Sequence, residues 1–284
     1  MEPQPSEPAT TGGRRRPAAG RNLPMAVGSG LVLGLLVLVT DYLWPPVFVG
    51  VVVVAILIAV WELVHAVAAR GANPPQVPLG VGTVAVLIAA YVGGPDALAV
   101  AFVLTVLAIM LTRLTGPVEG AVVDLAAGVW IAGYVPLMAA FAVLMVAQPD
   151  GADRIVVFVL TTICSDIGGY LAGVLFGRHP MAPTISPKKT WEGFAGSVLL
   201  CVVAGSVSAH VLLGAAWWQG MLVGLAVVVT ATLGDLAESM LKRDLGIKDM
   251  GRLIPGHGGM MDRLDSLAPT APVVYLLLTV FVGG

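Results

Sequence analysis

The sequence predicts an all-α, polytopic integral membrane protein with about nine transmembrane helices and a cytoplasmic N-terminus. Of its 284 residues, 57% are hydrophobic and only 11% are charged, whereas a soluble domain carries about a quarter charged residues. The apolar residues form separate runs, and a helix needs roughly 20 such residues to cross a bilayer. The basic residues gather in alternate connections between these runs.

The chain divides into a polar tail and two groups of apolar segments. Residues 1–22, rich in proline and arginine, predict a disordered cytoplasmic tail. Residues 23–147 hold the N-terminal transmembrane helices, and residues 155–284 form a C-terminal transmembrane region with cytoplasmic loops 177–193 and 242–265. The expected spans are about 23–40, 45–64, 78–94, 96–112, 121–147, 155–176, 194–213, 217–234 and 267–282.

The distribution of lysine and arginine predicts the orientation. With the N-terminus in the cytoplasm, 14 of the 15 Lys and Arg residues lie on the cytoplasmic side, and only Arg154 lies outside. This bias fits the positive-inside rule. It also favours a single fifth span, kinked or tilted at Pro136, because splitting it would move eight later cations outside. We expect the plasma membrane as location, with both polar loops facing the cytoplasm.

The eighth span runs into the densest polar stretch of the chain. If its helix continues, Asp235, Glu238, Ser239 and Lys242 share one face. Asp235 then lies at the membrane boundary, where a carboxylate is costly unless it is paired or binds a metal. The alternative is an interfacial Asp235 that faces water, with Lys242 and Arg243 as ordinary membrane anchors.

The loop that follows is rich in glycine and in basic residues, which suits phosphate recognition. Open backbone N–H groups can cradle phosphate oxygens, and cationic side chains add charge-assisted donors. The alternative, a basic loop on anionic lipid headgroups, leaves the nearby aspartates unexplained. His257 is a candidate general base or phosphate donor, or else a hydrogen-bonded turn residue. The candidate cationic phosphate donors are Lys242, Arg243, Lys248 and Arg252, and the glycines of this stretch include Gly258 and Gly259.

Two aspartates precede the last span. Asp262 and Asp265 are three residues apart and share a helical face. Asp262 and Asp235 enter from opposite sides of the loop, and two converging carboxylates are a typical protein contribution to a Mg²⁺ site. For Asp265 the alternative is a salt bridge to Arg263 or Lys248.

The sixth span and the loop after it supply a second polar group. Asp166, about halfway along the span, is a candidate site residue because intramembrane carboxylates are costly. Its alternative role is that of a buried hydrogen-bond acceptor. Lys188 and Lys189 lie in a loop on the same side of the membrane as the loop 242–265. Thr190 is the expected N-cap of the next helix. The glycines at 168, 169, 173 and 177 allow close approach of a helix or of a ligand, and we favour tight helix packing. We interpret Glu62, His65 and Asp124 as structural.

The pattern around these residues resembles the signature of the phosphatidate cytidylyltransferases (CDP-diglyceride synthases). The matching residues are Ser239, Lys242, Arg243, Lys248, Asp249, Gly251, Pro255, His257, Gly258, Gly259, Asp262, Arg263, Leu264 and Asp265. Asp166, Tyr170 and the block 185–193 also resemble that family. The resemblance covers roughly the C-terminal half; the N-terminal half is similar only as a multi-span apolar region.

The resemblance implies that CMP is transferred from CTP to phosphatidate, giving CDP-diacylglycerol and pyrophosphate for phospholipid synthesis. It implies Mg²⁺ held by Asp235 and Asp262, with a second cation such as K⁺ at the same site, and a homodimer. CTP, phosphatidate and the bilayer are the expected partners, and no nucleic acid is expected. The assigned catalytic residues are Asp235, Asp262, Lys242, Asp249 and His257. The assigned substrate-binding residues are Asp166, Lys188, Lys189, Ser239, Arg243, Lys248, Gly258, Gly259, Arg263 and Asp265.

Three alternative functions remain open at this point. A CTP-using enzyme with a different lipid acceptor would share the same loops, because the sequence does not define the acyl pocket. A transporter would use Asp166 as an intramembrane ion site, although the polar residues gather in cytoplasmic loops rather than at the midplane. A non-catalytic lipid-binding scaffold would have no use for the intact set of acidic and basic residues. Acyl-chain preference and the choice between CTP and dCTP are also undetermined.

Overall fold

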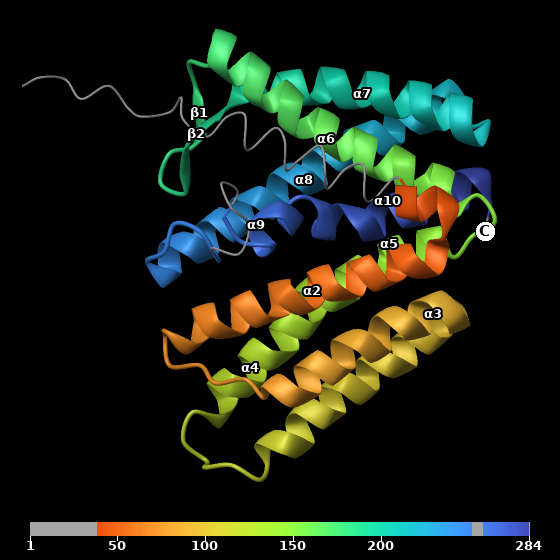
Figure 1. The fold of residues 1–284 in the computed structure, drawn as a ribbon. Coiled ribbons are helices and arrows are strands. Elements are labelled where there is room, and N and C mark those ends of the chain that lie inside the picture. The colour runs from red at the N-terminus through yellow and green to blue at the C-terminus, as the bar shows by residue number, and fades with distance from the viewer. Residues whose placement is uncertain (1–38, 252–257, 284) are drawn as a thin grey trace, which may run out of the picture.

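The computed structural model describes residues 39–251 and 258–283 and is mainly a bundle of long helices (Figure 1). The predicted tail, most of the predicted first span and His257 lie outside these residues. The helices are α2 (Pro45–Ala68), α3 (Gln76–Arg113), α4 (Ala121–Ala132), the π-helix η1 (Gly133–Leu137), α5 (Met138–Val146), α6 (Gly151–Phe176), α7 (Trp191–Leu213), α8 (Trp217–Leu245), α9 (Met261–Leu264) and α10 (Leu267–Val282).

Seven helical segments in the described residues are long and apolar enough to cross a membrane. One of them, α3, is 38 residues long and turns at Gly94. This residue has a φ of 67°, a left-handed conformation that glycine adopts readily. A methyl group on Gly82 would lie 2.9 Å from Cβ of Thr105, so the two legs of α3 pack side by side. The predicted spans 78–94 and 96–112 are these legs. The total of nine stays a prediction.

The fifth predicted span is continuous from Ala121 to Val146, through α4, η1 and α5. Pro136 lies inside the π-helical turn. Proline lacks a backbone N–H and crowds the preceding turn of an α-helix, and a local π-turn absorbs both effects without ending the helix. The prediction of one irregular span is therefore confirmed.

A small sheet modifies the all-α prediction. Strands β1 (Pro180–Ala182) and β2 (Ser186–Thr190) pair in antiparallel fashion inside the predicted loop 177–193. This segment is short and contains three prolines, which disfavours a helix. Both strands are edges of a two-stranded sheet, where proline is tolerated. The hairpin therefore gives the basic residues of β2 a defined backbone.

Helices α6 and α7 pack with their backbones close together (Figure 1). A methyl group on Gly168 would lie 2.5 Å from the carbonyl oxygen of Gly196, and one on Gly193 would lie 2.9 Å from that of Gly169. Small residues allow such close approach in membrane helices. The predicted packing role of these glycines is confirmed, and α7 begins at the predicted cap, where Thr190 Oγ1 accepts from Gly193 N at 3.1 Å.

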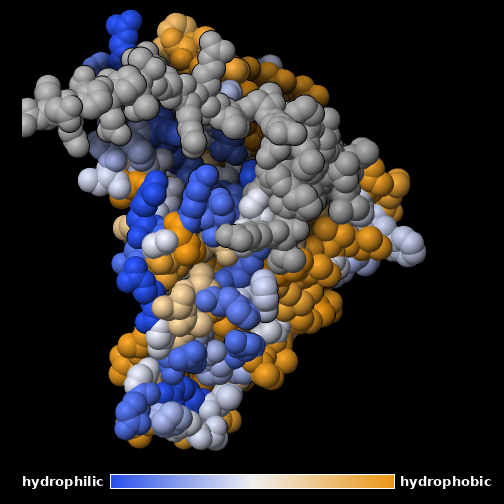
Figure 2. Space-filling view, turned by 60° about the vertical axis from the view of Figure 1, so that its left-hand side comes forward, coloured by the Kyte–Doolittle hydropathy of each residue, from blue (hydrophilic) through white to orange (hydrophobic). Residues whose placement is uncertain are grey.

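The polar connections gather at one end of the bundle. The α2–α3 and α3–α4 connections, the described ends of the α8–α9 connection and the β-hairpin lie at this end, whereas the α5–α6 connection lies at the other (Figure 1). Figure 2, with the polar end turned forward, shows hydrophilic residues gathered there beside apolar flanks. Among the described Lys and Arg residues, only Arg154 belongs to the opposite end; the others are Arg70, Arg113, Arg178, Lys188, Lys189, Lys242, Arg243, Lys248 and Arg263.

Candidate active site

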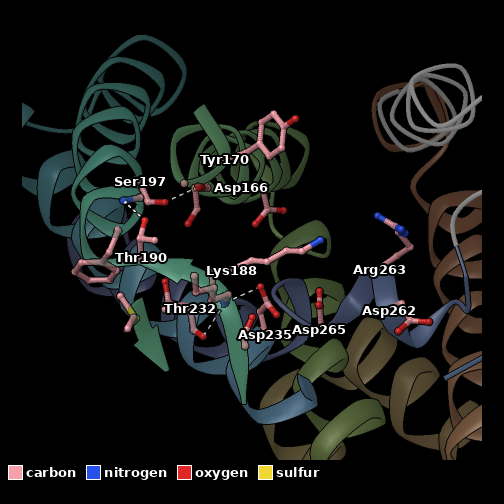
Figure 3. Close-up of a pocket in the computed structure, with 18 residues that line it drawn as sticks. Asp166, Tyr170, Lys188, Thr190, Ser197, Thr232, Asp235, Asp262, Arg263 and Asp265 are labelled. Carbon is pink, nitrogen blue, oxygen red and sulfur yellow. Dashed lines mark hydrogen bonds and ion pairs between the residues drawn. The ribbon is translucent and has the colours of Figure 1, made fainter. Parts of the chain in front are cut away.

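A polar cavity of about 450 Å³ opens between α6, the hairpin, α7, α8 and α9 (Figure 3). The residues that line it extend from Ser165 to Asp265 in the sequence. The predicted site residues that line it are Asp166, Lys188, Lys189, Asp235, Asp262, Arg263 and Asp265. The lining also includes polar groups that the sequence analysis did not assign to the site, among them Ser165, Thr190, Ser197 and Thr232.

Asp235 is held between the hairpin and its own helix. Lys189 on β2 places its Nζ 2.6 Å from Oδ2 of Asp235, and the hydroxyl of Ser239, one turn along α8, donates to Oδ1 at 3.3 Å. The lysine comes from the hairpin, so the small sheet directly supplies the cation that pairs with this carboxylate.

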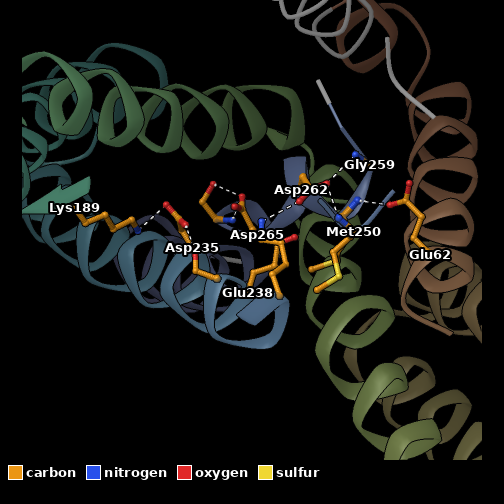
Figure 4. A network of polar contacts seen from close by, with 12 residues as sticks. Glu62, Lys189, Asp235, Glu238, Met250, Gly259, Asp262 and Asp265 are labelled. Carbon is orange, nitrogen blue, oxygen red and sulfur yellow. Dashed lines mark hydrogen bonds and ion pairs between the residues drawn. The ribbon is translucent and has the colours of Figure 1, made fainter. Parts of the chain in front are cut away.

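Asp262 is fixed by donors on both of its oxygens (Figure 4). Lys242 donates to Oδ1 at 2.9 Å. The backbone N–H groups of Met250 and Gly259 donate to Oδ2 at 3.0 and 2.8 Å. Only 8% of the Asp262 side chain is exposed, so its orientation is set before any ligand binds.

The predicted polar face of α8 exists because the helix continues to Leu245 before Gly246 caps it. Lys242 bridges Asp262 and the fully buried Glu238, to which it donates at 3.0 Å. A buried carboxylate needs such a partner, because burial removes its hydration. Asp262 and α8 are thus joined through one lysine.

The remaining predicted site residues lie around the cavity. Arg243 donates to the carbonyl of Ile185 at 3.3 Å and so joins α8 to the hairpin turn. Lys248 and Asp249 are exposed and do not line the cavity. Gly258 has a φ of 82°, and a methyl group there would lie 3.0 Å from Oδ2 of Asp262. Their proposed contacts with nucleotide stay predictions.

The donor set fits a magnesium ion bound together with phosphates. The described residues contain no group of three or more His, Cys, Asp or Glu side chains arranged around one metal position. Mg²⁺ does not require such a group, since it is commonly bound by one or two carboxylates plus phosphate oxygens and water. Asp235 and Asp262 line one cavity and are the residues that would supply these carboxylates. In the structure, Lys189 pairs with Asp235 and Lys242 pairs with Asp262, so each carboxylate charge is balanced by a lysine.

An apolar cavity of about 700 Å³ adjoins the polar one. Residues of α2, α5, α6 and α10 line it, together with Leu264 of α9 and Met260 just before that helix. Arg263 lines both cavities, and among the described residues it is the only charged one in the lining of the apolar cavity. The boundary between the two cavities therefore carries a guanidinium group.

Of the three residues interpreted as structural, Glu62 lies closest to the site. Its side chain is 1% exposed, and its Oε1 and Oε2 accept from the backbone N–H groups of Met260 and Met261 at 3.1 and 2.9 Å. A carboxylate inside an apolar span was the signal in the sequence. By contrast, Asp124 pairs with Arg113 at 2.9 Å away from the cavity, as a structural role predicts.

Comparison with known proteins places the whole arrangement in a family. Residues 25–281 match the cytidylyltransferase family. The chain is 41% identical to a phosphatidate cytidylyltransferase of Mycobacterium bovis, over 97% of this chain and 96% of the relative. It is also 41% identical to one of Mycobacterium leprae, over 94% of this chain and 90% of the relative.

The chain belongs to the cytidylyltransferase family. The resemblance seen in the C-terminal motifs is therefore confirmed, and with it the prediction of a membrane-embedded nucleotidyltransferase. A phosphatidate cytidylyltransferase of Brucella suis is 36% identical over 55% of this chain and 57% of the relative. The family match also includes α2, so Glu62 and the wall of the apolar cavity belong to the shared region.

Proposed function

We propose that the protein transfers CMP from CTP to phosphatidate, producing CDP-diacylglycerol and pyrophosphate. The observation that carries the proposal is the pair of adjoining cavities joined at Arg263. One cavity offers carboxylates and cations to a nucleotide, and the other offers an apolar volume within the roughly 300–1,000 Å³ of typical ligand sites. A lipid phosphate substrate needs both environments side by side. The names of the relatives support the same reaction.

In the proposed reaction, a phosphate oxygen of phosphatidate attacks the α-phosphorus of CTP. A new P–O bond forms there, the bond to the β-phosphate oxygen breaks, and pyrophosphate leaves with the bonding electrons. Because a phosphomonoester has a second pKa of about 6, the attacking oxygen is already ionised at neutral pH. No serine, cysteine or histidine nucleophile is required.

The residues of the cavity would overcome the repulsion between two anionic substrates. Mg²⁺, when bound, would neutralise phosphate charge and help to align the in-line attack. Asp235 and Asp262 would hold it. Lys188 and Arg263 would donate to phosphate oxygens, with the arginine suited to the lipid phosphate at the boundary between the cavities. The acyl chains would extend into the apolar cavity.

The concentration of cations at one end supports an orientation with the polar cavity open to the cytoplasm. In a bacterial plasma membrane, this orientation presents the site to the cytoplasmic pool of CTP. The lipid would reach the same site from within the bilayer.

The first test is pyrophosphate release by purified protein in detergent with CTP, dioleoyl phosphatidate and Mg²⁺. Release that requires both the lipid and Mg²⁺ would support the reaction. Release without lipid would indicate nucleotide hydrolysis instead. A folded protein that releases none with phosphatidate but does so with another phospholipid acceptor, such as an archaetidate, would replace the proposed substrate.

A further inference from the structure

Glu62 joins the N-terminal half of the protein to the turn that carries Asp262. It lies on α2, and its two oxygens accept from Met260 and Met261, which are 198 and 199 residues away in the sequence. The carboxylate is buried, so these backbone N–H groups replace water around it. The contact links α2 to the start of α9.

Two glycines leave the space that the Glu62 carboxylate occupies. A methyl group on Gly259 would lie 2.6 Å from Oε2 and 2.8 Å from Oε1 of Glu62, and one on Gly251 would overlap the same carboxylate. Both glycines belong to the loop that resembles the family signature. The loop is therefore shaped around a side chain from the other half of the molecule.

Three consecutive backbone N–H groups in this turn are divided between two carboxylates (Figure 4). Gly259 N donates to Oδ2 of Asp262, and the next two, from Met260 and Met261, donate to Glu62. The position of the Asp262 carboxylate depends on the path of this turn, and Glu62 holds that path.

We propose that Glu62 is a positioning residue for Asp262, which it places for metal binding through the backbone of residues 259–261. The proposal rests on the proposed function, in which Asp262 is a metal ligand. Outer partners that orient metal ligands typically change metal affinity or activity by about 10–100-fold when they are replaced. Glu62 meets that description through the backbone rather than through a side chain.

The test compares Glu62→Gln with Asp124→Asn, a matched change of a buried carboxylate in the same half of the chain. Asp124 also accepts a backbone N–H, from Asn73 at 2.6 Å, but it lies away from the cavity. Glutamine keeps the size of Glu62 while turning its NH₂ group toward one of the two N–H donors. Mn²⁺ is titrated into each purified protein with CTP and without lipid, and its binding is followed by electron paramagnetic resonance.

We expect Glu62→Gln to weaken Mn²⁺ binding about 10-fold or more. The half-saturating Mg²⁺ concentration for turnover should rise in parallel, with the KM for phosphatidate unchanged. Asp124→Asn should lower thermal stability without changing Mn²⁺ affinity. Folded Glu62→Gln protein with wild-type Mn²⁺ affinity would overturn the positioning role and leave the proposed reaction intact. A wild type that turns over without binding Mn²⁺ would overturn the metal assignment, and the positioning role with it.

If Glu62→Gln does not accumulate as folded protein, hydrogen–deuterium exchange measured on the wild-type protein tests the proposal instead. Mn²⁺ with CTP should slow exchange at 258–264 and in α2 around Glu62 together, because the two segments share hydrogen bonds. Slowing at 258–264 with no change in α2 would contradict the proposal.

Discussion

At the scale of single residues, the two candidate metal ligands are held in different ways. Asp262 receives two backbone donors and a lysine, so its carboxylate is pre-oriented. Asp235 relies on Lys189 and a long hydrogen bond from Ser239. We infer that Asp235 has more freedom to reorient when a cation and nucleotide arrive.

Replacing Asp262 by asparagine should reduce turnover by about 10²-fold or more, the loss typical of removing one group that stabilises charge in a transition state. Asparagine retains the shape but loses the charge and places an NH₂ group against one of the donors. Asp153→Asn is the control, because Asp153 lies at the opposite end and accepts from Tyr42 at 2.7 Å. Pyrophosphate release measured on folded protein checks both. Near wild-type turnover in Asp262→Asn would remove Asp262 from the metal site.

Lys189 and Lys188 are adjacent but should behave differently on substitution. Lys189→Ala leaves Asp235 without its 2.6 Å partner and should lower turnover about 10-fold or more. Lys188→Ala removes a cation that lines the polar cavity and should mainly raise the KM for a phosphate-bearing substrate. Steady-state kinetics with CTP and lipid varied separately distinguishes the two. If a variant with both Lys188→Ala and Lys189→Ala kept the wild-type turnover and the wild-type KM values for CTP and lipid, the hairpin would not belong to the active site.

At the scale of elements, the α6–α7 contact lies beside the polar cavity, because residues of both helices line it. Gly168→Ala should destabilise the protein by about 1–3 kcal/mol, since the added methyl has only backbone to meet and the helices must separate. Gly80→Ala is the matched control, because nothing in the described protein lies within 4 Å of its added methyl. Thermal unfolding in detergent measures the difference. Equal melting temperatures for the two variants would mean that the helices separate without cost.

The elements also show which parts of the fold are open to prediction from sequence. The spans from 45 onward, the continuation of α8 and the cap at Thr190 all follow from local pattern. The hairpin does not, because its strands are short and rich in proline and are stabilised by a contact with α8 through Arg243. The turn of α3 at Gly94 was predicted only as a gap between two spans.

The residues of the candidate site could also be predicted only in part. Asp235, Asp262 and the two lysines stand out because charges are rare in an apolar chain. Glu62 was equally visible but had no neighbour in the sequence to suggest a partner. Its partners are backbone N–H groups about 200 residues away. Every residue except proline has such a group, so the residue types at 260 and 261 do not reveal the contact.

At the scale of the whole molecule, the orientation in the membrane is testable by chemical labelling. In a background with Cys164 and Cys201 replaced, a cysteine at Ala147 should react with an impermeant maleimide in intact spheroplasts. A cysteine at Thr115 should react only after permeabilisation, because it lies at the end rich in cations. The reverse pattern would place the polar cavity outside the cell and remove its access to CTP.

The contact between Glu62 and Met260 also bears on how the chain is made. Glu62 is synthesised and inserted long before the backbone N–H group of Met260 that donates to it, since 198 residues separate the two. Until the last part of the chain arrives, the growing protein carries an unsatisfied carboxylate within an apolar span, which is costly in lipid. The turn that positions Asp262 thus also supplies the donors that a side chain of the N-terminal half requires. A nascent chain that stops short of it would retain a polar defect that a membrane protease can recognise.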